Sequence, residues 1–362
     1  MANTIFFTGA GGFIGQYLLP HFFDHEEELY LLEFGNFIQR LNDFLDANAP
    51  EEARKRIHVV PGDITKPDLG LEPALQDKLK NTMTKCIHLG AIYNLSVPRE
   101  VAWKVNVEGT RNVLDFIAKC PNFNRLAFAS TTAVVGYYKG RFSEDDFDMG
   151  QSFKNNYDET KFESEKLVRE RWDRIPSVIY RPGYVIGDTK HGRIEKIDGP
   201  YYAMTMIKRR LHLVVPKGAD TYFHLVPVDY VADAMYYLLM DEHAANQAYH
   251  LTDPNPCTYD EFFDLTCAAM GTFKPLLRLN PRILAPIMRR GFIAKITGVP
   301  YEAFQYADHP IEYDTTKTEA VMAHYGVHCP HLSEYIDVLV KFFLEHYNDP
   351  HIRRGDWQAG AT

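Results

Sequence analysis

The chain has 362 residues, enough for one large α/β domain with an added lobe or for two domains, and its hydrophobic fraction of 46% and charged fraction of 24% are ordinary for a soluble globular protein. Its net charge of −9 argues against a nucleic-acid partner, and no run of about 18 apolar residues predicts a membrane span. The N-terminus enters structure without a targeting segment, and the five cysteines form no CxxC pair. We therefore predict a cytoplasmic protein with reduced thiols.

Apolar runs that predict strands alternate with amphipathic helical runs through the N-terminal half of the chain. The strand candidates are residues 4–10, 29–34, 57–63, 85–91, 124–131 and 176–183, and the first helix begins near Phe13. Continuous apolar strands separated by helices are typical of a parallel sheet that is covered on both faces. We therefore predict a Rossmann-type, doubly wound α/β fold that binds ligands at the carboxyl ends of its strands.

The pattern loosens after Gly187, where glycine, proline and aromatic residues become frequent. We predict that residues 1–190 form the Rossmann domain and that residues 191–350 mainly form a smaller, mixed substrate-binding lobe. Residues 223–254 have the pattern of a helix and strands, and we expect them to return to the main body.

A glycine-rich stretch, TGAGGFIG at residues 8–15, directly follows the first strand and opens the first helix. Gly9 permits a tight turn, Gly12 lets a pyrophosphate approach the backbone, and Gly15 lets the helix lie close to the strand. The helix N-terminus at Phe13 and Ile14 presents N–H groups to phosphates. The stretch predicts that residues 1–190 bind a dinucleotide.

Two acidic residues follow later strands. Glu33 closes the second strand, eighteen residues after Gly15, where a carboxylate accepts both ribose hydroxyls and repels the 2′-phosphate of NADP. We therefore predict NAD over NADP, although Arg40 leaves some room for NADP. Asp63 is placed to meet the adenine amino group with Ile64 beside the ring, but an isolated aspartate is also typical of a turn.

The stretch Leu89-Gly90-Ala91 ends the fourth strand with two small residues, as is needed where backbone passes a bound cofactor. Farther along, Tyr157 and Lys161 lie four positions apart in a stretch that predicts a helix, so both side chains share one face. Packing does not require this pair. Tyr157 and Lys161 are either a catalytic pair or two polar residues on a solvent-exposed helical face.

The motifs together resemble those of an extended short-chain dehydrogenase/reductase. The similarity spans roughly residues 3–240 and rests on TGAGGFIG (8–15), Asp63-Ile64, LGA (89–91), NVEGT (106–110), AST (129–131), Tyr157-xxx-Lys161 and RPG (181–183).

The resemblance implies roles for several residues. Tyr157 would exchange a proton with the substrate, while Lys161 would hold the ribose and, as a nearby ammonium, lower the tyrosine pKa. A hydroxyl at Thr131, with Ser130 and Thr132 as rivals, would hold the substrate oxygen. The resemblance also implies that Asn106 braces the helix or a water near the lysine, that Pro182 and Gly183 border the cofactor, and that the protein is a homodimer.

Within that family, HLGAIYNLSVP (88–98) and YRPGYVIGD (180–188) are more similar to the fatty-acyl and thioester reductase branch than to the NAD-dependent epimerase/dehydratase branch. The reductase branch usually carries an arginine for NADP where this chain has Glu33-Phe34. We predict an NAD(H)-dependent oxidoreductase acting on an apolar carbonyl, an alcohol or an acyl thioester. The alternatives are a non-catalytic NAD-sensing binder, or a nucleotide-sugar epimerase/dehydratase with tightly bound NAD and a diphosphate pocket formed by Arg209, Arg210, Arg278 and Arg282.

The lobe has features that the motifs do not cover. Its apolar side chains line a hydrophobic substrate pocket or form the core of the lobe: Tyr201, Tyr202, Met204, Met206, Phe292, Ile293 and Phe304. Residues 276–304 form a lid, a peripheral membrane contact or a helix packed on the main domain. We predict no metal site in the segment containing His324, His328, Cys329 and His331, because Gly326 and Pro330 break any common helical face.

Overall fold

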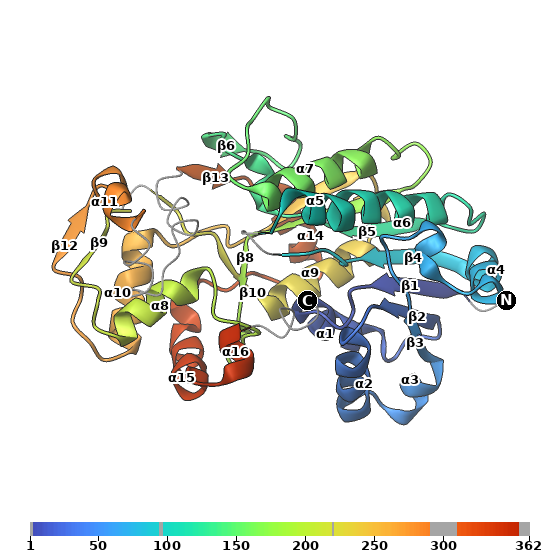
Figure 1. Cartoon of the computed structure of the whole chain (residues 1–362), viewed down its shortest axis with the longest axis horizontal. Coiled ribbons are helices and arrows are strands. Elements are labelled where there is room, and N and C mark those ends of the chain that lie inside the picture. Colours follow the sequence, from blue (N-terminus) through green and yellow to red (C-terminus); the bar gives the residue numbers. More distant parts are fainter. Residues whose placement is uncertain (1–2, 94–96, 219–220, 290–309, 355–362) are drawn as a thin grey trace.

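The computed structural model describes residues 3–93, 97–218, 221–289 and 310–354 (Figure 1). A seven-stranded sheet has the order β11-β7-β5-β4-β1-β2-β3, and every neighbouring pair is parallel. Its strands are β1 (Thr4–Thr8), β2 (Glu28–Glu33), β3 (Ile57–Pro61), β4 (Met83–His88), β5 (Arg125–Ala129), β7 (Ser177–Pro182) and β11 (Gln247–Leu251). The predicted Rossmann-type fold is confirmed. All six predicted strands are present, and each ends slightly earlier than predicted because the chain leaves the sheet to build loops at its carboxyl edge.

The sheet is buried on both faces, which explains why its strands are continuously apolar rather than alternating. Successive side chains of a strand point to opposite faces. Ile5 and Phe7 of β1 therefore join one hydrophobic cluster, while Phe6 between them joins the other. In β2, Leu31 and Leu32 divide in the same way.

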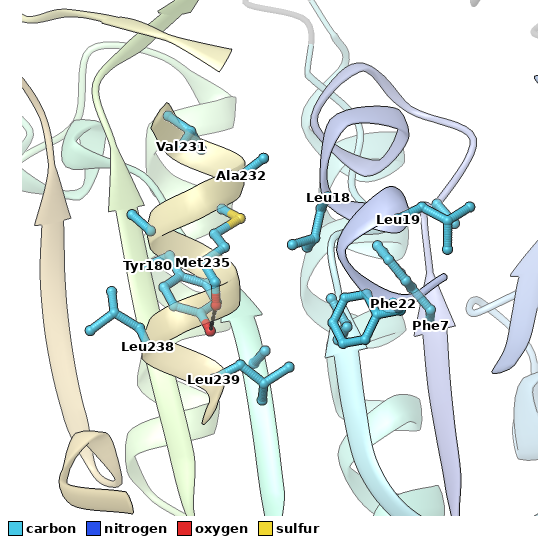
Figure 2. Close-up of a cluster of buried hydrophobic side chains, with 14 of the residues drawn as sticks. Phe7, Leu18, Leu19, Phe22, Tyr180, Val231, Ala232, Met235, Leu238 and Leu239 are labelled. Atoms are coloured by element: carbon cyan, nitrogen blue, oxygen red, sulfur yellow. Dashed lines mark hydrogen bonds between the residues drawn. The ribbon is translucent and has the colours of Figure 1, made fainter. Parts of the chain in front are cut away.

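Helices cover the two faces. One face carries α1 (Phe13–Leu18), α2 (Phe37–Asn48) and α9 (Val228–Met240), with α3 (Glu51–Arg56) leading into β3. The other carries α4 (Pro73–Thr82), α6 (Gly109–Ile117) and α7 (Asn156–Arg169), and α5 (Arg99–Ala102) leads through a π-helical turn, η3 (Trp103–Glu108), into α6. Figure 2 shows Met235 and Leu239 of α9 on the same side of the sheet as Phe22, and the Tyr180 hydroxyl donates to the Met235 carbonyl oxygen at 2.9 Å.

A smaller lobe lies beyond the carboxyl edge of the sheet (Figure 1, left). It contains α8 (Pro200–Lys208), α10 (Tyr259–Ala269), α11 (Pro281–Met288), α15 (Ile336–His346), α16 (Pro350–Arg354) and the parallel pair β9 (Val214–Pro216) and β12 (Leu277–Leu279). Its own core includes Met204, Phe262 and Leu339. The parallel pair β8 (Tyr184–Ile186) and β10 (Leu225–Pro227) continues the chain between sheet and lobe.

The chain returns from the lobe to the main body more than once. Residues 223–254 contribute β10, α9 and β11, and β11 extends the sheet beside β7. A second return was not predicted. β13 (Ile311–Tyr313) pairs with β6 (Gly140–Phe142), and α14 (Thr316–His324) places Met322 in the hydrophobic cluster of the main sheet. These elements are short and depend on distant partners, so local periodicity does not reveal them. None of the helices among the described residues is long and apolar enough to cross a membrane.

Candidate functional site

The glycine loop joins β1 to α1, and its glycines answer different steric demands. Gly9 has a φ of +80°, and a Cβ there would lie 2.7 Å from the Gly90 nitrogen. A Cβ on Gly15 would lie 2.5 Å from the Ala10 carbonyl oxygen. At Gly12 the nearest atom would be the Gly9 oxygen, at 3.3 Å, so the fold itself demands less there. Gly9 and Gly15 are therefore needed to build the loop, whereas a Cβ at Gly12 would have a single close contact.

Glu33 is tied directly to this loop. Its side chain is 5% exposed, and its Oε1 atom accepts a hydrogen bond from the Gly11 N–H at 2.6 Å. Burial raises the pKa of Glu33 to about 7, while the Gly11 hydrogen bond and the charge of Arg40 act in the opposite direction. The carboxylate thus lies between the end of β2 and the turn that a pyrophosphate would approach.

The predicted adenine-side residues lie at the end of β3. The Asp63 Oδ1 atom accepts hydrogen bonds from the Thr65 N–H at 2.9 Å and from the Thr65 hydroxyl at 2.7 Å. This is the turn-forming arrangement that the sequence left open as the alternative. Ile64 is buried, and a Cβ on Gly109 of α6 would meet its side chain.

The end of β4 packs against the glycine loop. The Leu89 N–H donates to the Thr8 carbonyl oxygen at 3.0 Å, and the Gly90 N–H to the Thr8 hydroxyl at 3.2 Å. His88 lies buried between the hydroxyls of Thr8 and Thr110, at 2.7 and 3.1 Å, and burial lowers its pKa to about 3. It is a neutral strand residue. Ala91, which follows Gly90, is exposed.

Asn106 braces the loop that follows. Its Oδ1 atom accepts from the Ile92 N–H at 2.8 Å, and its Nδ2 atom donates to the Ile92 carbonyl at 3.3 Å and to the Thr160 hydroxyl at 3.1 Å. Asn106 therefore joins the loop after β4 to α7, and it sits in the π-helical turn η3, a type of distortion frequent at functional sites.

Three consecutive residues at the end of β5 contact one face of α7. The Lys161 ammonium donates to the Ala129 carbonyl oxygen at 2.5 Å. The Ser130 hydroxyl donates to Glu165 Oε2, also at 2.5 Å. The Tyr157 and Thr131 side chains hydrogen-bond to each other. Tyr157, Lys161 and Glu165 follow at intervals of four, so one helical face carries all three contacts.

These contacts distinguish the three candidate hydroxyls. That of Thr131 bonds to Tyr157, that of Ser130 donates to Glu165, and that of Thr132 donates to the Pro182 carbonyl at 3.3 Å. Thr131 is therefore the hydroxyl that the structure brings to the tyrosine. Gly183 follows Pro182, and a side chain there would collide with the carbonyl of His224.

The electrostatics of the pair differ from the expectation. Desolvation raises the pKa of the Tyr157 phenol, the charge of Asp158 raises it further, and the Thr131 hydrogen bond opposes them. The Lys161 ammonium donates to the Ala129 carbonyl, and the net pKa of the phenol is raised, not lowered as expected. Burial lowers the pKa of Lys161 to about 8, against the charge of Glu165.

A buried ion pair lies beneath this face of α7. Glu165 and Arg181 have side chains that are 0% exposed, and Arg181 Nη2 lies 2.6 Å from Glu165 Oε1. Arg169 Nε adds a second contact to the same oxygen at 2.9 Å. Glu165 was not predicted as a site residue, although it lies four positions after Lys161 and so continues the Tyr157–Lys161 spacing. Tyr93 was also missed; its ring packs edge-on against that of Tyr157, with centroids 5.1 Å apart.

The apolar residues of the lobe are divided. Tyr201 and Met204 belong to the core of the lobe, and the Tyr201 hydroxyl accepts a hydrogen bond from the Gly187 N–H at 2.9 Å. Met206 is also buried, whereas Tyr202 is half-buried. For Tyr201 and Met204 the core alternative therefore holds. Phe292, Ile293 and Phe304 lie outside the described residues. Within the described ranges, no group of three or more His, Cys, Asp or Glu side chains could hold a metal ion.

Several known proteins are similar to this chain. Aldehyde reductase lnbA of Aspergillus flavus is 29% identical over 271 residues, which cover 70% of this chain and 27% of that protein. Fatty acyl-CoA reductase wat of Drosophila melanogaster is 23% identical, over 64% of this chain and 53% of that protein. The chain therefore spans about a quarter to a half of the length of these two relatives.

A solved structure is also similar to this chain. The terminal R domain from the myxalamid PKS-NRPS biosynthetic pathway is 27% identical and superposes with a TM-score of 0.82, covering 96% of this chain and 91% of that domain. The family described as male sterility protein matches residues 7–235, a span that contains the glycine loop, Glu33, Thr131, Tyr157 and Lys161. The chain belongs to this family, within the extended short-chain dehydrogenases/reductases.

Proposed function

We propose that this protein is an NAD(H)-dependent reductase that acts on an apolar carbonyl or an acyl thioester through Thr131, Tyr157 and Lys161. The observation that carries the proposal is the contact between the end of β5 and one face of α7, which joins the Thr131 hydroxyl to the Tyr157 phenol. The names of the relatives, an aldehyde reductase and a fatty acyl-CoA reductase, support a carbonyl or acyl substrate.

The residues at the carboxyl edge fit a nicotinamide dinucleotide. The loop surface at Gly12 has no side chain, and the buried Glu33 carboxylate lies beside it. The glycine loop and Glu33 would hold the pyrophosphate and the adenosine ribose, and Lys161 the second ribose. When bound, the cofactor supplies a hydride to the substrate carbon.

Thr131 and Tyr157 would then act on the substrate oxygen. Their two hydroxyls form a pair of donors that can hold one carbonyl oxygen, and Tyr157 gives its proton to that oxygen as the carbon is reduced. The raised pKa of Tyr157 suits this direction, because the phenol stays protonated near neutral pH. From a thioester the product of this step is a hemithioacetal, which releases a thiol to leave an aldehyde.

The nucleotide-sugar alternative requires a basic pocket for a diphosphate. Arg278 instead pairs with Asp260, at 3.1 Å, and with Asp264. The Arg209 Nε atom donates to the Tyr347 hydroxyl at 3.0 Å. Two of the four arginines proposed for that pocket thus have contacts within the lobe, which favours the reductase.

A substrate screen tests the proposal. We expect one or more aldehydes, ketones or acyl thioesters to cause net loss of NADH absorbance with the purified protein. Turnover of a nucleotide sugar with no net change in NADH would support the epimerase alternative instead. Cofactor binding without turnover of any substrate would support the non-catalytic binder.

Cofactor preference gives a second test. We expect NAD(H) to bind at least about tenfold more tightly than NADP(H), equivalent to about 1.4 kcal/mol, because the Glu33 carboxylate accepts the ribose hydroxyls and repels a 2′-phosphate. Glu33→Ala should weaken this preference, whereas Glu26→Ala, at an exposed position just before β2 and at the opposite end of the strand from Glu33, should not. Titration of both cofactors measures the ratio, and tighter binding of NADP(H) to the wild type would contradict the assignment.

The rate of reduction should also depend on pH. The pKa of Lys161 is about 8, so its ammonium is present below that pH and is lost above it. If the ammonium holds the cofactor ribose, kcat/KM for reduction should fall as the pH rises through about 8, because this parameter reports groups of the free enzyme. A flat profile between about pH 7 and 9 would show that the charge of Lys161 is not needed.

A further inference from the structure

Residues 193–195, in the segment that follows β8, contact the helices α1 and α2. Glu195 Oε1 lies 2.7 Å from Arg40 Nη1 of α2, a contact between residues 155 positions apart. The guanidinium of Arg193 donates to Gln16 Oε1 of α1 at 3.3 Å. These two contacts hold residues 193–195 against α1 and α2, the helices that precede and follow β2 in the chain.

Arg40 belongs to the environment of Glu33. Its positive charge acts to lower the pKa of that carboxyl group. Glu33 in turn accepts the N–H of Gly11, whose carbonyl oxygen accepts from Gln16 Nε2 at 3.1 Å. Arg193, Gln16, Gly11 and Glu33 thus form a continuous chain of contacts, and the Arg40–Glu195 ion pair lies beside it.

An arginine beside the end of the second strand is the feature that a 2′-phosphate needs. In this protein the two side chains of the ion pair are each 23% exposed, so solvent screens their attraction only in part. A 2′-phosphate reaching Arg40 would have to displace the Glu195 carboxylate. It would also meet a second negative charge, that of the Glu33 carboxylate.

We propose that Glu195 is a specificity-determining residue: by holding Arg40 in an ion pair, it excludes a 2′-phosphate from the adenosine end of the site. This proposal rests on the nicotinamide cofactor of the proposed function. Discrimination then has two parts, repulsion by Glu33 and occupation of Arg40 by Glu195. Glu195 comes from the segment that leads to the lobe and not from the Gly15-to-Glu33 region where cofactor preference is usually sought.

The test is a comparison of dissociation constants for NADPH and NADH, measured by titrating the fluorescence of the reduced nucleotides without substrate. Glu195→Gln keeps the size of the side chain and removes its charge. We expect it to tighten NADPH binding about tenfold while changing NADH binding less than about twofold. Glu242→Gln, at an exposed glutamate of the 3-10 turn Glu242–Ala244, removes the same charge away from the site and should change neither constant.

Two further variants connect the effect to Arg40. In an Arg40→Met background, Glu195→Gln should give no gain in NADPH affinity, because the cation that it releases is missing. With Arg40 present, the double variant Glu33→Ala/Glu195→Gln should raise NADPH affinity by more than the product of the two single effects, since both changes act on one phosphate site.

Two results would overturn the proposal while leaving the reductase assignment intact: equal changes in NADPH and NADH binding by Glu195→Gln, or a gain that persists without Arg40. If the wild-type protein bound neither nucleotide, the proposed function would fail as well. A denaturant-unfolding midpoint close to that of the wild type shows that each variant is folded.

Discussion

Replacing Tyr157 by phenylalanine is expected to lower kcat by a factor of about 10² to 10⁴, the range for a positioned proton donor. The change removes one oxygen atom and keeps the ring that packs edge-on against Tyr93. It also leaves Lys161 bonded to the Ala129 carbonyl, so cofactor affinity should remain within about twofold of the wild type. Initial rates of NADH consumption and a cofactor titration measure the two quantities.

Matched variants make this result specific. Tyr222→Phe removes the same atom from an exposed tyrosine and should leave kcat unchanged. Lys161→Ala should reduce both cofactor affinity and rate, because it removes the proposed ribose contact. Near-normal turnover by Tyr157→Phe would show that the tyrosine is not the proton donor.

The largest effect on stability is expected from Glu165→Ala. The substitution leaves Arg181 buried without its carboxylate partner, and breaking a buried pair in this way costs about 3–5 kcal/mol of unfolding free energy. It also removes the acceptor of the Ser130 hydroxyl. Denaturant unfolding measures the loss, and Glu170→Ala, at the exposed end of the same helix, serves as the control.

The same pair has a defined pH dependence. Burial tends to raise the pKa of Glu165, but the charges and hydrogen bonds of Arg181, Arg169 and Ser130 hold it at about 2. Since an unfolded glutamate has a pKa of about 4.3, its stabilising contribution is present above that pH and is lost as the pH falls toward 2. The destabilisation by Glu165→Ala should therefore be full at pH 7 and shrink in acid. An unfolding difference of less than about 1 kcal/mol at pH 7 would contradict the importance of the pair.

Some tertiary contacts could be anticipated from local sequence and others could not. The Tyr157–Lys161 spacing predicted a shared helical face, and Glu165 extends that face by one step. In contrast, Ser130, Thr131 and Thr132 are three consecutive hydroxyls, and their spacing alone does not tell which one meets the tyrosine. That assignment depends on how the end of β5 turns against α7 and β7.

The amino-acid sequence by itself determined the sheet, because strands buried on both faces must be continuously apolar, and it determined the glycine loop, because only glycine tolerates the backbone contacts at Gly9 and Gly15. The tertiary structure decided what depends on distant segments. It placed Tyr201 and Met204 in the core of the lobe, and it paired Arg40 with Glu195 across 155 positions. The physical reason is that periodicity and turn chemistry are local, whereas the partner of a buried charge or an apolar side chain is decided only when the whole chain packs.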